Sequence, residues 1–131
     1  LPFLQELETY ISIVPAVNQI EFSPWLFLQR ELEWCQEKKS VLQSFSPLAR
    51  GKKFNDPVVS RLAAQYNKTP AQIILRWDIQ LGVSVIPKSG NPKRIEENFN
   101  IFDFQLSNED MKQLSSLNEN FRVVEDPMEW L

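Results

Sequence analysis

The segment Val83–Asn98 (VSVIPKSGNPKRIEEN) holds the residues of this chain that are best suited to binding an anion. An apolar run, Val83–Pro87, ends at Lys88 and Ser89, a Gly-Asn-Pro turn follows, and the helical pattern after it carries Arg94. This order sets an ammonium, a hydroxyl, free backbone N–H groups and a guanidinium around a helix N-terminus, where anions are favoured. The pattern therefore predicts binding of a phosphate-bearing ligand. A solvated basic turn, balanced by the acidic residues that follow it, is the alternative.

The elements that must position these groups follow a repeated order along the chain. Three times an apolar run is followed by a turn or loop and then by a helical pattern. The expected strands are Ala16–Phe22, Val41–Phe45 and Val83–Pro87. Such alternation favours a parallel sheet with helices outside it.

Capping residues mark where the expected helices begin and end. Asp56-Pro57 and Thr69-Pro70 each open a helix, Gly82 stops the second of these, and Ser107 caps the last helix. The other expected helices cover about Phe27–Lys39 and Pro92–Phe99.

Three strands alone leave the sheet incomplete. Both outer strands would be long apolar edges, which native proteins avoid. An eight-stranded β/α barrel takes about 250 residues, whereas this chain has 131. We therefore expect an α/β fold that is the C-terminal part of a larger barrel, with its N-terminal half absent. A small stand-alone α/β domain is the alternative.

Composition is that of a globular protein, with 43% hydrophobic and 24% charged residues. The net charge of −3 gives no electrostatic reason to expect nucleic acid or an anionic membrane as a partner. No apolar run approaches the roughly 20 residues of a membrane span. The single cysteine, Cys35, cannot form an internal disulfide, which favours a reducing, cytoplasmic setting.

Five separated motifs resemble, in order and spacing, the C-terminal half of the aldo-keto reductases, from about Val17 to Asn118. They are NQIEFSPW, SFSPLARG, KTPAQIILRW, VIPKSGNPKRIEEN and IFDFQLSNEDM. That family folds as a (β/α)8 TIM barrel and reduces aldehydes and ketones with NADPH. The resemblance implies that residues 1–131 are a partial NADP-dependent oxidoreductase domain carrying the sixth, seventh and eighth strands. Binding groups of such barrels gather at the C-terminal ends of the strands.

The resemblance assigns four residues to the nicotinamide and pyrophosphate of the cofactor. Gln19 matches the position whose amide holds the nicotinamide carboxamide, and Phe45 matches the aromatic that stacks on the ring. Ser46, through its hydroxyl, and Leu48, through its backbone, match positions that line the pyrophosphate. From the residues alone, Gln19 could equally be a polar barrel-core group, Phe45 an ordinary core aromatic, and Ser-Pro a turn.

Five further residues match the adenosine end of the cofactor. Lys88, Ser89 and Arg94 match the site of the 2′-phosphate, where lysine acts as a point charge and arginine can pair with phosphate and lie over the adenine. Glu97 and Asn98 match positions that hydrogen-bond the adenine amino group. This set implies NADPH or NADP+ rather than NADH.

The family's catalytic Asp, Tyr, Lys and His all lie upstream of the matched region, and this chain contains no histidine. We therefore expect no catalytic residue and no metal ligand here, and an isolated chain that is inactive. Trp25, after the first strand, is a candidate for contact with a small carbonyl substrate, although a packing or interface role fits as well. A full-length protein would be a monomer or a weak oligomer. The alternatives are a non-catalytic structural or regulatory protein of the same fold, or an inactive truncated product.

Overall fold

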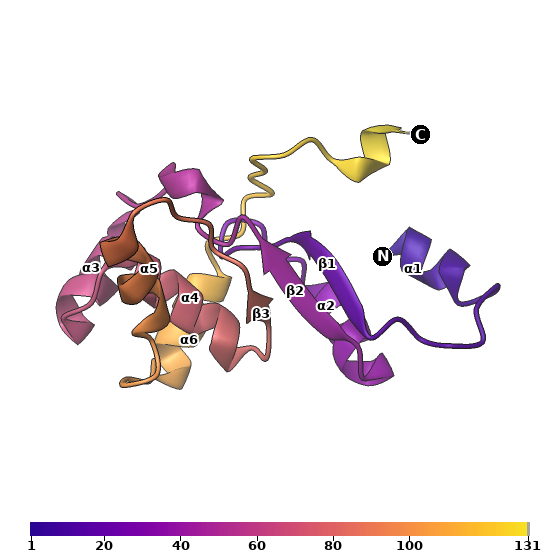
Figure 1. The fold of residues 1–131 in the computed structure, drawn as a ribbon, viewed down its shortest axis with the longest axis horizontal. Coiled ribbons are helices and arrows are strands. Elements are labelled where there is room, and N and C mark those ends of the chain that lie inside the picture. Colours follow the sequence, from indigo (N-terminus) through magenta and orange to yellow (C-terminus); the bar gives the residue numbers. More distant parts are fainter. Residues whose placement is uncertain (131) are drawn as a thin grey trace.

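The computed structural model describes residues 1–130, in which three parallel strands carry helices along one face (Figure 1). The strands β1 (Val17–Glu21), β2 (Val41–Phe45) and β3 (Ser84–Val85) lie side by side in that order. The third strand is shorter than the expected run because Pro87 has no amide hydrogen to extend the ladder. Pairing with β2 ends where the Ile86 N–H donates to the Ser44 carbonyl oxygen at 3.2 Å.

The helices begin where the capping residues predicted. Asp56 Oδ1 accepts from the N–H groups of Val58 and Val59, and Ser107 Oγ accepts from that of Asp110. Thr69 forms a full capping box. The helices are α1 (Pro2–Leu7), α2 (Gln29–Lys38), α3 (Pro57–Tyr66), α4 (Pro70–Gln80), α5 (Pro92–Phe99) and α6 (Asn108–Ser115), with 3-10 turns η1 (Ala49–Gly51) and η2 (Pro127–Trp130).

One face of the sheet is covered by helices and holds the core. Because side chains alternate along a strand, Leu42 and Ser44 of β2 point to this face, and both are buried. Beyond the sheet, the Phe22 and Trp77 rings stack at a centroid distance of 5.4 Å, and Trp77 Nε1 donates to Ser115 Oγ. This aromatic layer joins the end of β1 to α4 and α6.

The opposite face of the sheet is uncovered. Gln19 Nε2 donates to Gln43 Oε1 at 2.7 Å, and Gln43 Nε2 donates to Ser84 Oγ at 3.4 Å, so a polar row crosses all three strands. On the same face, Val17 and Val41 keep 48% and 44% of their surface exposed. The strands of a barrel bury both faces, so this arrangement fits part of a barrel.

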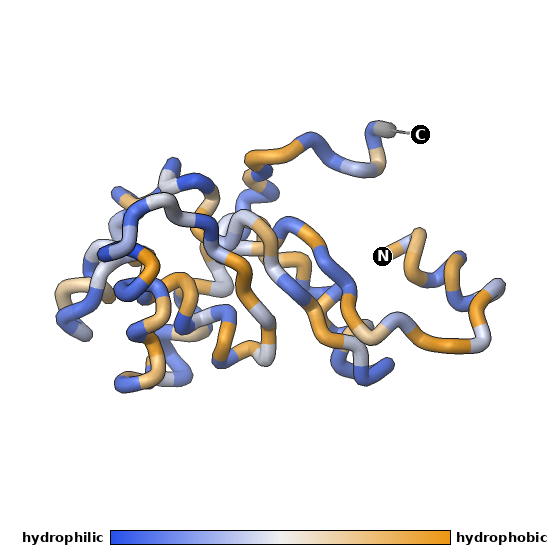
Figure 2. The backbone as a smooth tube through the Cα atoms, in the orientation of Figure 1, coloured by the Kyte–Doolittle hydropathy of each residue, from blue (hydrophilic) through white to orange (hydrophobic). Residues whose placement is uncertain are grey.

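Hydrophobic residues occur in the segments on both sides of the sheet (Figure 2), and several of their side chains are exposed. Ile13 is 82% exposed in the loop between α1 and β1, and Phe99 and Phe102, at and after the end of α5, are 76% and 61% exposed. Extended apolar patches on a protein surface commonly mark interaction sites. Among residues 1–130, no helix has the length and apolar character needed to cross a membrane.

Candidate functional site

A groove of about 940 Å3 lies at the carboxyl ends of β2 and β3, between the loop after β2 and helix α5. Its volume is within the range of sites that take small molecules and cofactors. Seven residues predicted from the sequence line it: Ser46, Leu48, Lys88, Ser89, Arg94, Glu97 and Asn98. The fold therefore brings together groups that lie up to 52 positions apart in the chain.

Four residues of the loop after β2 have positive φ values. Ser46, Ala49 and Arg50 have φ values of 50°, 47° and 53°, followed by Gly51 at 74°. The Ala49 N–H donates to the Ser46 carbonyl at 2.9 Å, and the Gly51 N–H donates to the Leu48 carbonyl at 2.8 Å. A left-handed conformation costs a residue other than glycine about 1–2 kcal/mol. Such strain is concentrated at binding sites, and here it shapes the wall of the groove.

The turn after β3 holds fewer open amides than the sequence suggested. Ser89 Oγ accepts from the Asn91 N–H at 3.1 Å, and Asn91 Oδ1 accepts from the Lys93 N–H at 2.9 Å. Pro92 has no N–H to offer. Within residues 1–130, Arg94 alone among the first three residues of α5 therefore keeps an open backbone donor.

Three cationic side chains border the groove. Lys88 and Arg94 were predicted, whereas Arg50, in the strained loop, was missed because an isolated arginine after a Ser-Pro turn carries no sequence signal of its own. All three are exposed, and none takes part in an ion pair within the part of the chain that the structure describes. Unneutralised cations at a groove attract anions.

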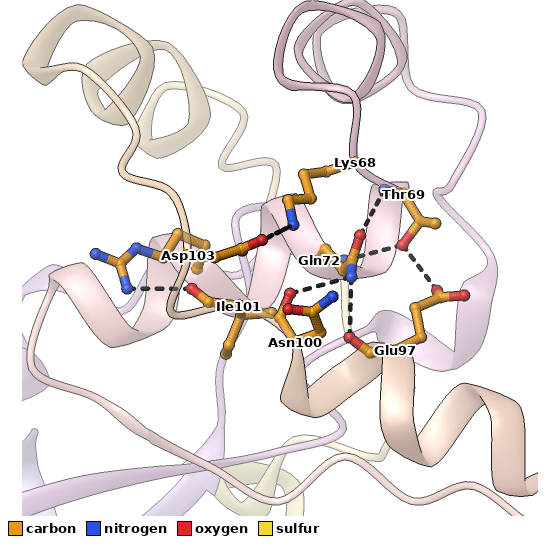
Figure 3. Close-up of polar contacts among 8 residues, drawn as sticks. Lys68, Thr69, Gln72, Glu97, Asn100, Ile101 and Asp103 are labelled. Carbon is orange, nitrogen blue, oxygen red and sulfur yellow. Dashed lines mark hydrogen bonds and ion pairs between the residues drawn. The ribbon is translucent and has the colours of Figure 1, made fainter.

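Glu97 is tied to α4 rather than lying free on an exposed helix face (Figure 3). The Thr69 hydroxyl donates to Glu97 Oε1 at 2.7 Å, and Gln72 Nε2 donates to the Glu97 carbonyl oxygen at 3.0 Å. Glu97 Oε2 makes no hydrogen bond within residues 1–130. Sequence reasoning missed Thr69 and Gln72 as partners of this site, although it identified Thr69 as a cap.

Gln19 and Phe45 lie outside the groove. Both line a second hollow of about 400 Å3 beside β1, bordered by α1, the start of α2 and the C-terminal segment. Phe45 ends β2, immediately before Ser46 of the groove, so the two hollows meet at the carboxyl end of this strand. The structure thus divides the predicted residues between two adjoining hollows.

Glu21 holds the C-terminal segment against the end of β1, a role that sequence reasoning did not find. Its side chain is 4% exposed, and its oxygens accept from the N–H groups of Val123 at 2.7 Å and Val124 at 3.1 Å. The Glu21 carboxylate is thus partnered in spite of its burial. A partner 102 positions away leaves no local signal.

The suggestion that Trp25 contacts a substrate is not supported, and a packing role is favoured. The side chain is 1% exposed, and Nε1 donates to Asp56 Oδ2 at 3.2 Å. The Trp25 carbonyl oxygen accepts from the N–H groups of Glu119 and Phe121. Trp25 therefore joins the loop after β1 to α3 and to the C-terminal segment.

The titratable group with the largest perturbation lies away from both hollows. Asp78 of α4 is 0% exposed, and neither carboxylate oxygen has a hydrogen-bond partner within residues 1–130. Burial raises the pKa of this carboxyl well above its ordinary value, because the charged form loses its hydration. In the described residues, no three His, Cys, Asp or Glu side chains gather in a group that could hold a metal ion.

Comparison with known proteins places these features in a family. The sequence profile of the aldo/keto reductase family matches residues 4–119. The uncharacterized oxidoreductase YtbE of Bacillus subtilis is 44% identical over 124 residues, which cover 95% of this chain and 44% of that protein. The 9,11-endoperoxide prostaglandin H2 reductase of Trypanosoma cruzi is 44% identical over 128 residues, covering 95% of this chain and 45% of that protein.

Solved structures agree with the sequence comparison. A Gox0644 variant in complex with NADPH matches with a TM-score of 0.89 and 34% identity, over 97% of this chain and 47% of that one. A Bombyx mori aldo-keto reductase in complex with NADP matches with a TM-score of 0.86 and 34% identity, over 97% and 44% of the two chains. The chain thus spans about half the length of the relatives it matches.

Proposed function

The chain belongs to the aldo/keto reductase family, and from this we propose that it is the cofactor-binding C-terminal half of an NADPH-dependent reductase of aldehydes and ketones. Strands β1, β2 and β3 are then the sixth, seventh and eighth of a (β/α)8 barrel. The observation that carries the proposal is the groove at the ends of β2 and β3, where Lys88 and Arg94 meet without an anionic partner among the described residues. Two related structures hold NADPH or NADP.

In this proposal the groove takes the adenosine end of the cofactor. Lys88, Ser89 and Arg94 bind the 2′-phosphate, since a dianion is best held by two converging cations. Glu97 accepts from the adenine amino group through the oxygen that Thr69 leaves open, and Asn98 binds beside it.

The strained loop after β2 takes the pyrophosphate. Ser46 offers its hydroxyl, Leu48 its backbone, and Arg50 adds a third positive charge on the same side of the groove. Phosphate groups are bound well where backbone donors and cations converge.

The second hollow, lined by Gln19 and Phe45, takes the nicotinamide end. Phe45 offers a flat apolar surface for stacking. Gln19 donates through Nε2 to Gln43, which leaves Gln19 Oε1 to accept from a carboxamide N–H. When bound, the reduced cofactor supplies a hydride to the substrate carbonyl carbon, and the residues of this chain hold and orient it.

The proton for the carbonyl oxygen comes from residues outside this chain, which has no histidine to complete the family's Asp, Tyr, Lys and His. The isolated chain is therefore inactive with aldehydes. The substrate is a small carbonyl compound, and the setting is the cytosol, where a buried free thiol such as Cys35 stays reduced.

The deciding experiment combines the intact mass of the native protein with its full coding sequence and an assay of NADPH oxidation with simple aldehydes. A native chain of about twice this length that carries the upstream tetrad and turns over supports the proposal. A complete chain that binds NADPH without turnover indicates a structural or regulatory member of the fold. A native protein whose N-terminus lies near Leu1 indicates a truncated product. Turnover by the isolated 131-residue chain would refute the assignment of catalysis to another segment.

A further inference from the structure

The N-terminal cap of α4 is bonded directly to the helix that carries the adenosine-end residues (Figure 3). The Thr69 hydroxyl oxygen accepts from the Gln72 N–H at 3.3 Å, which caps α4. The hydrogen of the same hydroxyl goes to Glu97 Oε1 at 2.7 Å. One hydroxyl group therefore caps the N-terminus of α4 and holds a carboxylate on α5.

Gln72 makes the second half of this link. Its side-chain oxygen accepts from the Thr69 N–H at 3.0 Å, while Nε2 donates to the carbonyl oxygens of Glu97 at 3.0 Å and Asn100 at 3.1 Å. These carbonyls lie at the C-terminal end of α5, where that of Glu97 also accepts from the Asn100 N–H at 3.1 Å. Gln72 is 6% exposed, so its amide is held in one orientation by three bonds.

Helix α5 depends on such bonds because it has no buried residue of its own. The segment that follows it is held in the same way, since Lys68 pairs with Asp103 at 2.7 Å and Arg76 donates to the Ile101 carbonyl at 3.1 Å. The side chains of α4 and of the turn before it thus determine where α5 lies.

We propose that Thr69 and Gln72 are positioning residues for the adenosine end of the cofactor, an inference that rests on the proposed function. They touch no part of it, but they place Glu97 and the helix that presents Arg94 and Asn98 to the groove. Without the link, the ligand must order α5 when it binds, and affinity falls by the free energy of that ordering.

The test measures binding of 2′,5′-ADP, which carries the adenosine 2′-phosphate but no nicotinamide, to the intact protein by titration calorimetry. Thr69→Val removes both the cap and the link to Glu97. Thr69→Asp keeps an acceptor for the Gln72 N–H, since aspartate is a good helix cap, but sets a carboxylate against Glu97. Thr69→Ser keeps both functions, and Ser107→Ala removes the cap of α6, away from the groove.

We expect Thr69→Val and Thr69→Asp to weaken 2′,5′-ADP about tenfold, the equivalent of about 1.4 kcal/mol. Thr69→Ser and Ser107→Ala should bind within about twofold of the unaltered protein. Melting temperatures separate stability from positioning, because Thr69→Asp should melt close to the unaltered protein and still bind weakly. A purely structural role predicts that Thr69→Val and Ser107→Ala lose stability alike and keep full affinity, and that result overturns the inference.

The proposed function and the inference fail in different ways. An unaltered protein that binds no 2′,5′-ADP refutes the proposed function and the inference together. If the unaltered protein binds 2′,5′-ADP and the Thr69→Asp variant binds it equally well, only the role given to Thr69 and Gln72 is refuted.

Discussion

Replacing Lys88 with alanine tests the most specific part of the proposed site, the binding of a 2′-phosphate. Lys88 lies in the loop after β3, exposed at the groove, and within residues 1–130 no acidic side chain pairs with it. Arg94 faces the same groove from the first turn of α5. Each is therefore free to bind an anion in the ligand.

The magnitude follows from the loss of one charge-assisted contact. Such a hydrogen bond is worth about 1.5–3 kcal/mol, so Lys88→Ala or Arg94→Ala should weaken NADPH about 10- to 150-fold. NADH lacks the 2′-phosphate and should lose no more than about twofold with Lys88→Ala. Arg94→Ala should weaken NADH somewhat more, because the guanidinium can also lie over the adenine.

The assay is equilibrium binding of NADPH and NADH to the intact protein, with Lys93→Ala as the matched control. Lys93 is an exposed cation next to Arg94 on α5 but does not line the groove. Its removal changes net charge by the same amount, so it reports the long-range electrostatic effect alone. Equal losses of NADPH and NADH with Lys88→Ala, or equal losses of NADPH with Lys88→Ala and Lys93→Ala, would refute the 2′-phosphate site and leave a solvated basic turn.

Three further substitutions test the interior of the fold. Because burial raises the pKa of Asp78, the folded state binds its proton more tightly and stability falls as pH rises above about 4. Asp78→Asn should therefore add about 1–3 kcal/mol to the free energy of unfolding at pH 7 and little at pH 3 in urea titrations; a gain independent of pH would contradict this. The Tyr66 hydroxyl donates to Asp110 at 2.6 Å and is the main cause of the lowered pKa of the Asp110 carboxyl. This shift stabilises the folded state at pH values above the pKa of Asp110 in the unfolded chain. The stabilisation is lost as the pH falls through the lower pKa of Asp110 in the folded state. Tyr66→Phe should cost about 1–2 kcal/mol at pH 7 and less at pH 3, and an undiminished loss in acid would count against that coupling. Glu21→Gln leaves one acceptor oxygen for two amides, so hydrogen exchange of the C-terminal segment should quicken about tenfold while that of β2 stays unchanged; equal acceleration of both would instead indicate global destabilisation.

The helix starts were predictable from the sequence because capping is local. Asp56, Thr69 and Ser107 each bond to an amide two or three positions away, so the residue types and their spacing already contain the geometry. The parallel order of the three strands was predictable for a similar reason, since each is joined to the next by a helical crossover. The short third strand was not predicted, because Val83–Pro87 has the apolar character of a strand along its whole length.

The predicted groove residues come together as expected, while their roles toward a cofactor stay predictions. What sequence reasoning missed depends on partners far along the chain. Trp25 is buried through Asp56, and Glu21 is bonded to amides beyond residue 120. Nothing in the segments around Trp25 and Glu21 distinguishes a buried anchor from a residue that contacts a ligand.

Under the proposed function, the two hollows would separate cofactor affinity from chemistry along this chain. The walls of the groove are built within residues 46–98, with α5 held by α4, so its selectivity depends on contacts that this segment makes with itself. Gln19 and Phe45 instead lie on the face of the sheet that no helix covers in residues 1–130. Groups that complete that face from outside this chain would set the position of the nicotinamide and of the carbonyl substrate. Substitutions in the groove should therefore change which cofactor binds and how tightly, while the rate of hydride transfer should respond to residues facing the uncovered sheet.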